Sequence, residues 1–243
     1  MSATIFDWEA PREAALEVHL LGLVDFDAAQ VLQERLAMQI AAGVDQGGAL
    51  LICEHPPLVT IGREGSWGHV RMSPEEFAAR RWDVRWITRG GGCITHVPGQ
   101  IAAYPIIPLA RRGIGIAAFR EQLQAAIIET CRECRVAARQ QPQQAGVWGR
   151  GGELAQVGIA VRSGVSMQGV FVNVCPRLDQ LRLIAPAGRA ITSLAVERRV
   201  PTSLGSVRES LIRRLASQLE YDRFHLHTGH PQLRRTRRVV AYA

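Results

Sequence analysis

Residues 89–100 carry the densest group of side chains in this sequence that could bind a ligand and react with it. An arginine enters three consecutive glycines, a cysteine and a histidine follow them, and Pro98-Gly99 then forces a turn. Glycine tolerates positive φ and has no side chain, so a ligand can lie against main-chain N–H groups that we expect to be unshielded. We therefore predict a small-molecule cradle with reactive groups at its rim, rather than a glycine-rich corner between strands.

Cys93 and His96 are the nearest nucleophile and base within this stretch. A thiol beside Arg89 and exposed loop N–H groups is expected to have a lowered pKa, and His96 is placed to accept its proton. The alternative is that Cys93 is a small apolar residue facing the core from a strand edge. A direct transfer between two bound substrates, with His96 taking the proton, needs no covalent intermediate.

The composition limits the possible compartments. No run approaches eighteen uninterrupted apolar residues, and the acidic start of the chain does not resemble a secretory signal, so neither a membrane span nor a signal is expected. The five scattered cysteines favour reduced thiols in a cytoplasmic location. Cys131 and Cys134 continue a helical apolar stripe and are interpreted as core residues rather than zinc ligands.

The charge limits the possible chemistry. The chain contains no lysine, so any lysine general base, Schiff base or phosphate clamp must come from another molecule. The net charge of +7 includes four arginines in the last ten residues, without the interleaved aromatics that a nucleic-acid platform needs. No nucleic-acid partner is expected, and the arginines on the body of the protein would equally suit an acidic protein partner.

The elements that position the cradle follow from periodicity and capping signals. Helices are predicted from Asp25 or Asp27 to Gly43, after a Ser73-Glu76 capping box, over 114–136, and from a Ser206-Glu209 capping box to Leu219. Strands are predicted over 16–21, 49–53, 58–61, 84–88, 101–107, 146–148, 154–162 and 169–174. His55, beside two prolines, is interpreted as a turn residue. The alternating His225, His227 and His230 are interpreted as a solvated edge strand rather than a metal site.

This order of elements lacks the regular β-α alternation of a doubly wound sheet. It predicts an α+β fold in which helices pack on one face of a mixed or antiparallel sheet. The expected organisation is a single domain over 1–230, followed by a basic tail over 231–243.

Several short motifs between residues 20 and 219 keep a recognisable spacing. They are Glu54-His55-Pro56-Pro57, Arg89-Gly90-Gly91, His96-Val97-Pro98-Gly99-Gln100, Tyr104-Pro105-Ile106, Gly146-Val147-Trp148, Val157-Gly158-Ile159, Asn173-Val174 and Thr192-Ser193-Leu194. Together they resemble the lipoyl/octanoyl transferase family of the lipoate-protein ligase B type. Its members move an octanoyl group from acyl carrier protein to a lysine of lipoyl domains. The resemblance implies the catalytic-domain fold shared with biotin and lipoate protein ligases.

The departures from the family pattern concern its catalytic dyad. The position of the family's nucleophilic cysteine is Ala187, and the position of its activating lysine is Glu153. Alanine cannot form a thioester, and a carboxylate would raise the pKa of a neighbouring thiol. The family's His-Gly-Phe segment appears as Gln168-Gly169-Val170. The resemblance therefore implies an acyltransferase with a divergent active site.

The resemblance implies a substrate site without metal or cofactor, to which the glycine-rich stretch adds Cys93 and His96 as catalytic candidates. Its substrate-binding residues would be Arg89, Gly90, Gly91, Gly92, Cys93, Ile94, Thr95, His96, Gln156, Val157, Gly158, Gly169, Val170 and Phe171. The implied partners are acyl carrier protein and lipoyl-domain proteins. The protein itself is expected to be a cytoplasmic monomer. The alternatives are a non-catalytic member that binds an acyl group or lipoyl domain, and a lipoate ligase that uses a pre-formed adenylate.

Overall fold

Two β-sheets organise the computed structural model, which describes residues 15–44, 47–184 and 190–233. The larger sheet has seven strands in the order β10-β1-β2-β6-β9-β8-β7. Its strands are β1 (Leu16–Leu23), β2 (Ala49–Glu54), β6 (Gln100–Ile106), β7 (Gly146–Trp148), β8 (Glu153–Arg162), β9 (Val165–Asn173) and β10 (Phe224–Thr228). β1 runs parallel to both its neighbours, and the other pairs are antiparallel, so the predicted mixed sheet is confirmed.

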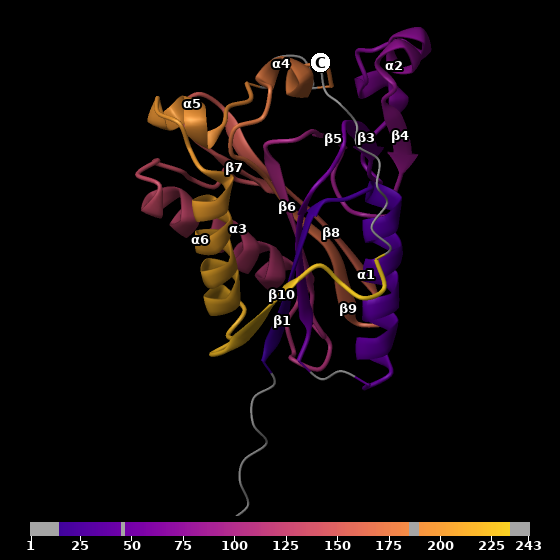
Figure 1. Cartoon of the computed structure of the whole chain (residues 1–243), viewed down its shortest axis with the longest axis vertical. Helices are drawn as coiled ribbons and strands as arrows, with labels where there is room; N and C mark the ends of the chain where they lie inside the picture. Colours follow the sequence, from indigo (N-terminus) through magenta and orange to yellow (C-terminus); the bar gives the residue numbers. More distant parts are fainter. Residues whose placement is uncertain (1–14, 45–46, 185–189, 234–243) are drawn as a thin grey trace, which may run out of the picture.

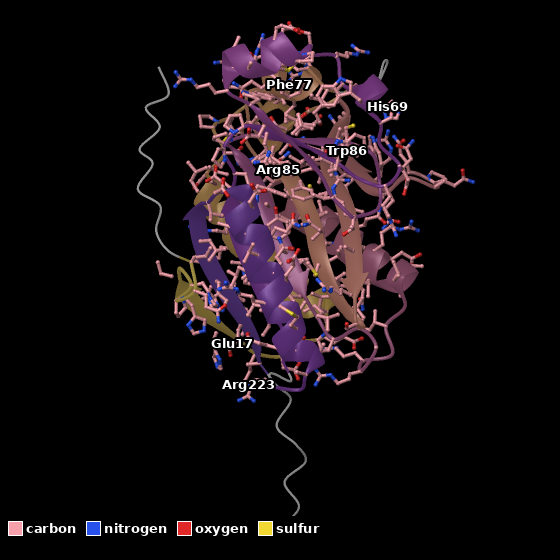
Figure 2. All side chains as sticks on the ribbon, turned by 90° about the vertical axis from the view of Figure 1, so that its right-hand side faces the viewer. Glu17, His69, Phe77, Arg85, Trp86 and Arg223 are labelled. Carbon is pink, nitrogen blue, oxygen red and sulfur yellow. The ribbon has the colours of Figure 1, made fainter. Side chains whose placement is uncertain are left out.

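The smaller sheet has the order β4-β3-β5 and contains part of the predicted cradle. Its strands are β3 (Leu58–Ile61), β4 (Asp83–Trp86) and β5 (Cys93–His96). The short helices η1 (Trp67–His69) and α2 (Pro74–Arg80) lie between β3 and β4 in the chain. Residues 93–96, which were predicted to belong to the glycine-rich loop, instead form a strand antiparallel to β3. Figure 2 shows Phe77, His69 and Trp86 together at one end of the molecule, away from Glu17 and Arg223.

Helices cover both faces of the large sheet (Figure 1). α1 (Phe26–Ala41) packs on one face, and α3 (Ile116–Glu133) packs on the other together with α6 (Leu204–Gln218). The prediction of helices on one face only is wrong because the central strands are apolar on both sides. In β2, Leu50 and Ile52 face the α3 side, whereas Leu51 and Cys53 face the α1 side.

Local capping signals account for several helix starts. The Asp25 carboxylate accepts a hydrogen bond from the Ala28 N–H at 3.0 Å, and the predicted Ser73-Glu76 capping box is present at α2. The box predicted at Ser206 is wrong, because α6 begins at Leu204 and the Ser206 hydroxyl donates to the Ser203 carbonyl. The remaining helices are α4 (Leu178–Arg182) and α5 (Leu194–Arg198).

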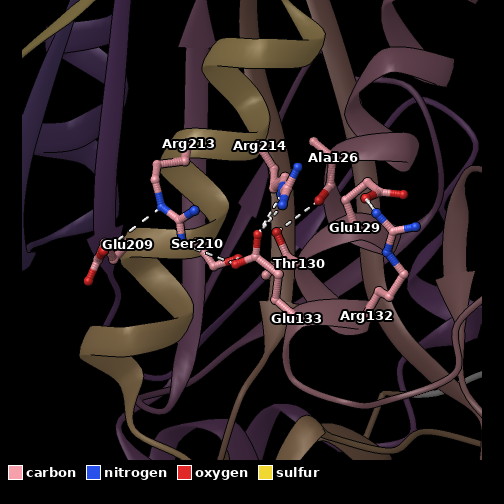
Figure 3. A network of polar contacts seen from close by, with 9 residues as sticks. All are labelled: Ala126, Glu129, Thr130, Arg132, Glu133, Glu209, Ser210, Arg213 and Arg214. Atoms are coloured by element: carbon pink, nitrogen blue, oxygen red, sulfur yellow. Dashed lines mark hydrogen bonds and ion pairs between the residues drawn. The ribbon is translucent and has the colours of Figure 1, made fainter.

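The pairing of α3 with α6 includes a charged network around Glu133 (Figure 3). Its carboxylate accepts from the Ser210 hydroxyl at 2.5 Å, from Arg213 Nη2 at 3.1 Å and from Arg214 Nε at 2.7 Å. Beneath this network the helices meet through buried apolar residues, including Ile127, Cys131 and Leu211. The interpretation of Cys131 as a core residue is confirmed.

His225 and His227 lie on a solvated edge strand, as predicted, whereas His230 lies beyond the end of β10 at Thr228 and contacts the His19 ring. β10 pairs in parallel with β1, and Glu17 on β1 accepts from His225 Nδ1 at 2.8 Å and from His227 Nε2 at 2.5 Å. Leu233 still packs against the α1 side of the core, two residues beyond the predicted start of the tail at 231. Residues 234–243 of that predicted tail lie outside the described residues. Within the described part of the chain, no helix combines the length and apolar character needed to cross a membrane.

Candidate active site

The centre of the candidate site is a fully buried arginine where the two sheets meet. Arg89 Nη2 donates to the carbonyl oxygen of Thr60 at 3.1 Å and to its hydroxyl oxygen at 2.9 Å. Arg89 Nη1 donates to the Gly90 carbonyl at 3.0 Å. A Cβ added at Gly158 would lie 2.6 Å from Arg89 Cδ, and one at Gly62 would lie 2.7 Å from Arg89 Nη1. These two glycines therefore form the slot in which the arginine side chain lies.

The main chain of the glycine loop is held by hydrogen bonds within the protein. The Gly90 N–H donates to the Ile159 carbonyl on β8 at 2.9 Å, and the Gly91 N–H donates to the Glu64 carboxylate at 3.0 Å. The carbonyls of Gly91 and Gly92 accept from residues 64 and 62. The expectation that the loop N–H groups are unshielded is therefore wrong for Gly90 and Gly91. Gly92 is the open position, since a Cβ there would meet no atom within 4 Å.

His96 lies on β5 beside Arg89 and is buried. Its Nε2 is 2.9 Å from the Thr60 hydroxyl oxygen. Its Nδ1 is also buried and has no hydrogen-bond partner in the described part of the protein. The ring packs against Phe26, His55 and Phe171, with centroid separations of 5.4, 5.8 and 4.7 Å. His96 is thus an imidazole in an apolar wall, connected to Arg89 through one hydroxyl group.

His55 belongs to the same buried group, although it was interpreted as a turn residue. Its Nδ1 lies 2.8 Å from the Val24 carbonyl, and its Nε2 lies 2.7 Å from the Tyr104 hydroxyl. A carbonyl only accepts, so Nδ1 carries the proton and Nε2 accepts from Tyr104. His55 is therefore a neutral imidazole of defined tautomer that packs against His96.

Burial dominates the electrostatics of this group. It lowers the pKa of the Arg89 guanidinium to about 10, which leaves the side chain charged at neutral pH. Burial lowers the pKa of His55 to about 4. Burial, together with the nearby His55 and Arg89, holds the pKa of His96 well below its ordinary value. Both histidines are neutral at pH 7, which disfavours His96 as a strong base.

Cys93 is not brought to His96. Side chains alternate along a strand, and β5 directs Cys93 and His96 to opposite faces of the small sheet. The Cys93 thiol donates to the Ser66 carbonyl at 3.6 Å and packs with Val59 and Ile61. Burial raises the pKa of this thiol and outweighs the lowering by the Ser66 contact and by Arg89. The expected lowering of its pKa is wrong, and the observed placement favours the alternative of a small residue at a strand edge.

The other predicted site residues divide between the two faces of their strands. Gly158 lies under Arg89, Phe171 packs on His96, and Ile94 packs with Phe171 on the α1 side. Gln156 alternates with Gly158 toward this same face of β8, directly opposite Phe171 on β9. By contrast, Val157 and Val170 face the α3 side and are core residues there.

Two further predicted residues contribute backbone rather than side chains. The Thr95 carbonyl accepts from Gln100 Nε2 at 3.2 Å. Gly169 is opposite Gly158, and a Cβ at Gly169 would lie 2.2 Å from the Ala103 carbonyl oxygen, so β9 and β6 can only approach this closely with a glycine there.

Of the two family dyad positions, Glu153 is the first residue of β8. Glu153 is buried, and its N–H donates to the Ala190 carbonyl at 2.8 Å. A Cβ at Gly146 would lie 2.5 Å from Glu153 Oε1, so the carboxylate packs against β7. Ala187 lies outside the described residues.

Sequence reasoning missed Thr60 and Tyr104 and misinterpreted His55. Thr60 sits in a fully buried four-residue strand, which is an unusual place for a hydroxyl without a partner. That local polarity was the one available signal. Within the described residues, no group of three or more His, Cys, Asp or Glu side chains could hold a metal ion.

The comparisons with known proteins agree with this architecture. Residues 25–224 match the model of the lipoyl protein ligase A/B catalytic domain. The chain is 38% identical to an octanoyltransferase of Geobacter metallireducens over 87% of this chain and 97% of that relative. It is 40% identical to an octanoyltransferase of Geotalea uraniireducens over 73% of this chain and 80% of that relative.

One solved structure is similar in fold at low sequence identity. It is a bipartite lipoate protein ligase with its E2 lipoyl domain from Thermoplasma acidophilum. The TM-score is 0.68 and the identity is 16%, with 90% of this chain and 89% of that chain covered. The likeness supports the predicted biotin/lipoate ligase type of fold.

Proposed function

The chain belongs to the lipoyl protein ligase A/B catalytic domain family, and on this premise we propose that it is an octanoyltransferase of protein lipoylation. The observation that carries the proposal is the identity of 38% with an octanoyltransferase over nearly the whole of both chains. The proposed donor is the octanoyl thioester of acyl carrier protein, and the proposed acceptor is a lysine of a lipoyl domain.

The proposed reaction is a direct transfer between the two bound substrates. The lysine ε-amine attacks the thioester carbonyl carbon, the C–N bond forms, the C–S bond breaks, and the amine proton ends on the departing thiol. The acceptor supplies the lysine that this chain lacks. Holding donor and acceptor together can contribute about 7–11 kcal/mol in well-oriented cases. The position of Cys93 and the alanine at position 187 both favour this route over a thioester on the enzyme.

The substrate-binding residues are proposed to be the glycine loop, His96 and the strands that face them. Gly92 leaves open space beside the main chain, where the thioester could lie. Phe26 and Phe171 are buried against His96 and make its surroundings apolar, which is the environment that an octanoyl chain prefers. We propose that the protein acts as a cytoplasmic monomer on protein partners, not on nucleic acid or membranes. Its five free thiols suit a reducing compartment.

The test is transfer between purified partners. The protein is incubated with octanoyl-acyl carrier protein and a lipoyl domain, and intact-mass spectrometry follows the acceptor. We expect one octanoyl group per lipoyl domain, and none on a control domain whose acceptor lysine is changed to arginine. Octanoylation that requires ATP and free octanoate would instead indicate a ligase. Binding of the lipoyl domain without any transfer would indicate a non-catalytic family member.

A further inference from the structure

Thr60 connects the two polar side chains of the candidate site. Its hydroxyl oxygen lies 2.9 Å from Arg89 Nη2 and 2.9 Å from His96 Nε2. Thr60 and His96 lie on adjacent strands, β3 and β5, and their side chains point to the same face of the small sheet. All three residues are buried, so their relative positions are set by the packing around them.

The Thr60 hydroxyl group can donate its proton to one acceptor among the described residues. A guanidinium has donors only, so Arg89 must donate to the Thr60 oxygen. The hydroxyl proton of Thr60 then remains to be donated, and His96 Nε2 is the one acceptor in contact with it in the described structure. Nε2 therefore accepts, and the single ring proton of neutral His96 lies on Nδ1.

That Nδ1–H group has no acceptor within the described part of the protein. The nearest imidazole cannot serve, since His55 Nε2 accepts from Tyr104 and His55 Nδ1 donates to Val24. An unsatisfied buried donor is energetically costly, so native structures rarely keep one without a reason. A buried donor without a partner in the described protein is suited to an oxygen atom of the substrate.

We propose that the Thr60 hydroxyl positions His96 as a neutral Nδ1–H donor to the acyl carbonyl oxygen, an inference that rests on the proposed octanoyl transfer. The hydrogen bond strengthens as the lysine amine attacks and negative charge develops on that oxygen. His96 keeps its proton throughout, and the amine proton still ends on the departing thiol. His96 thus acts as an electrophile rather than as the base expected from the sequence.

The buried charge of Arg89 supports this role in two ways. Its guanidinium polarises the Thr60 hydroxyl toward His96 and adds positive potential near the developing oxyanion. Arg89 also lowers the pKa of His96, although burial and His55 have larger effects. The imidazole therefore stays neutral, and its Nε2 remains a hydrogen-bond acceptor.

The first test compares Thr60→Val with Thr60→Ser. Valine keeps the volume and removes the hydroxyl, and we expect kcat for octanoyl transfer to fall by about 10²–10³-fold, as for the loss of one oxyanion donor, with little change in KM. Serine keeps the hydroxyl, and we expect it to restore kcat to within several-fold of the native enzyme. Thr228→Val, at the distant β10 edge, is the matched control and should leave transfer unchanged.

The second readout does not depend on activity. The ¹⁵N resonances of the His96 ring distinguish a protonated nitrogen from an unprotonated one. We expect Nδ1–H with unprotonated Nε2 in the native protein and in Thr60→Ser, and a shift toward Nε2–H in Thr60→Val. Thermal unfolding of each variant shows whether the fold is retained.

Two results would overturn the proposal. One is Nε2–H in the native protein, and the other is full activity in a folded Thr60→Val variant. A native protein with Nδ1–H that transfers no octanoyl group would refute the proposed function and the carbonyl role with it, while the tautomer assignment would stand.

Discussion

Gly158 on β8 lies directly beneath the side chain of Arg89, so that a Cβ at position 158 would be 2.6 Å from Arg89 Cδ. Real Cβ atoms do not approach a neighbour this closely, and the arginine would have to move. Arg89 holds the hydroxyl and the carbonyl of Thr60, so its displacement would be transmitted to His96.

We expect Gly158→Ala to damage both the fold and the reaction. Overpacking of a full interior costs about 1–3 kcal/mol, and the shift of Arg89 should lower kcat for octanoyl transfer at least tenfold. Gly92→Ala is the matched glycine-to-alanine variant, because a Cβ there has open space and no positive φ to strain it. It should unfold like the native protein in urea but raise KM, if the donor lies against Gly92.

Urea unfolding and steady-state transfer kinetics check both variants. Equal stability of Gly158→Ala and the native protein would contradict the described packing of Arg89. An unchanged KM in Gly92→Ala would argue against a substrate position beside Gly92.

Cys93→Ala is expected to retain transfer within about threefold of the native rate. The thiol faces away from His96 and bonds to the Ser66 carbonyl, and burial raises its pKa, so it is neither placed nor ionised for attack. Intact-mass analysis with octanoyl-acyl carrier protein alone should show no adduct on the native chain. An octanoyl adduct that Cys93→Ala abolishes would instead restore the covalent mechanism.

The sequence predicted those features of the fold that have local signals. The Asp25 cap, the Ser73-Glu76 box and most strands were predictable, because capping and alternation involve residues close together in the chain. β5 was not predictable in the same way, since a strand of four residues between a glycine run and a proline has no pattern of its own. Its recognition depends on pairing with β3.

The error at the site follows from that missed strand. In a loop, Cys93 and His96 could approach each other, whereas an odd separation in a strand sends them to opposite faces. Arg89 posed a second difficulty, because an arginine in a glycine-rich stretch is normally solvated and its burial depends on Gly158, sixty-nine residues away in the chain. The pairing of Thr60 with His96 likewise arises only from tertiary structure.

Acid should destabilise the protein through its buried neutral histidines. Burial lowers the pKa of His55 to about 4 from an ordinary 6.5, so the unfolded chain binds this proton first as the pH falls. The contribution of neutral His55 to the free energy of unfolding is fully present above pH 6.5 and is lost as the pH falls toward 4. The shift corresponds to about 3 kcal/mol of the free energy of unfolding.

Urea unfolding between pH 7.5 and pH 4.5 measures this slope. His55→Gln should have a shallower pH dependence than the native protein, although His96 will keep some of it. His69→Gln, an exposed residue of η1, is the control and should keep the native slope. Identical slopes in all three proteins would show that His55 is not buried in its neutral form.

Ala187 and Glu153 are the two positions at which this chain departs from the family dyad. The family pattern places its nucleophile at position 187 and its activating lysine at position 153, and the Glu153 N–H donates to the carbonyl of Ala190. In a Cys93→Ala background, we expect Ala187→Cys with Glu153→Lys to form an octanoyl adduct on incubation with octanoyl-acyl carrier protein. Ala187→Cys alone should form it at least tenfold more slowly at pH 7, because a carboxylate raises the pKa of a neighbouring thiol and an ammonium lowers it. Ala187→Cys with Glu153→Gln should fall between them, and intact-mass time courses give all three rates. Equal rates with glutamate and lysine at position 153 would show that this side chain does not act on a thiol at position 187.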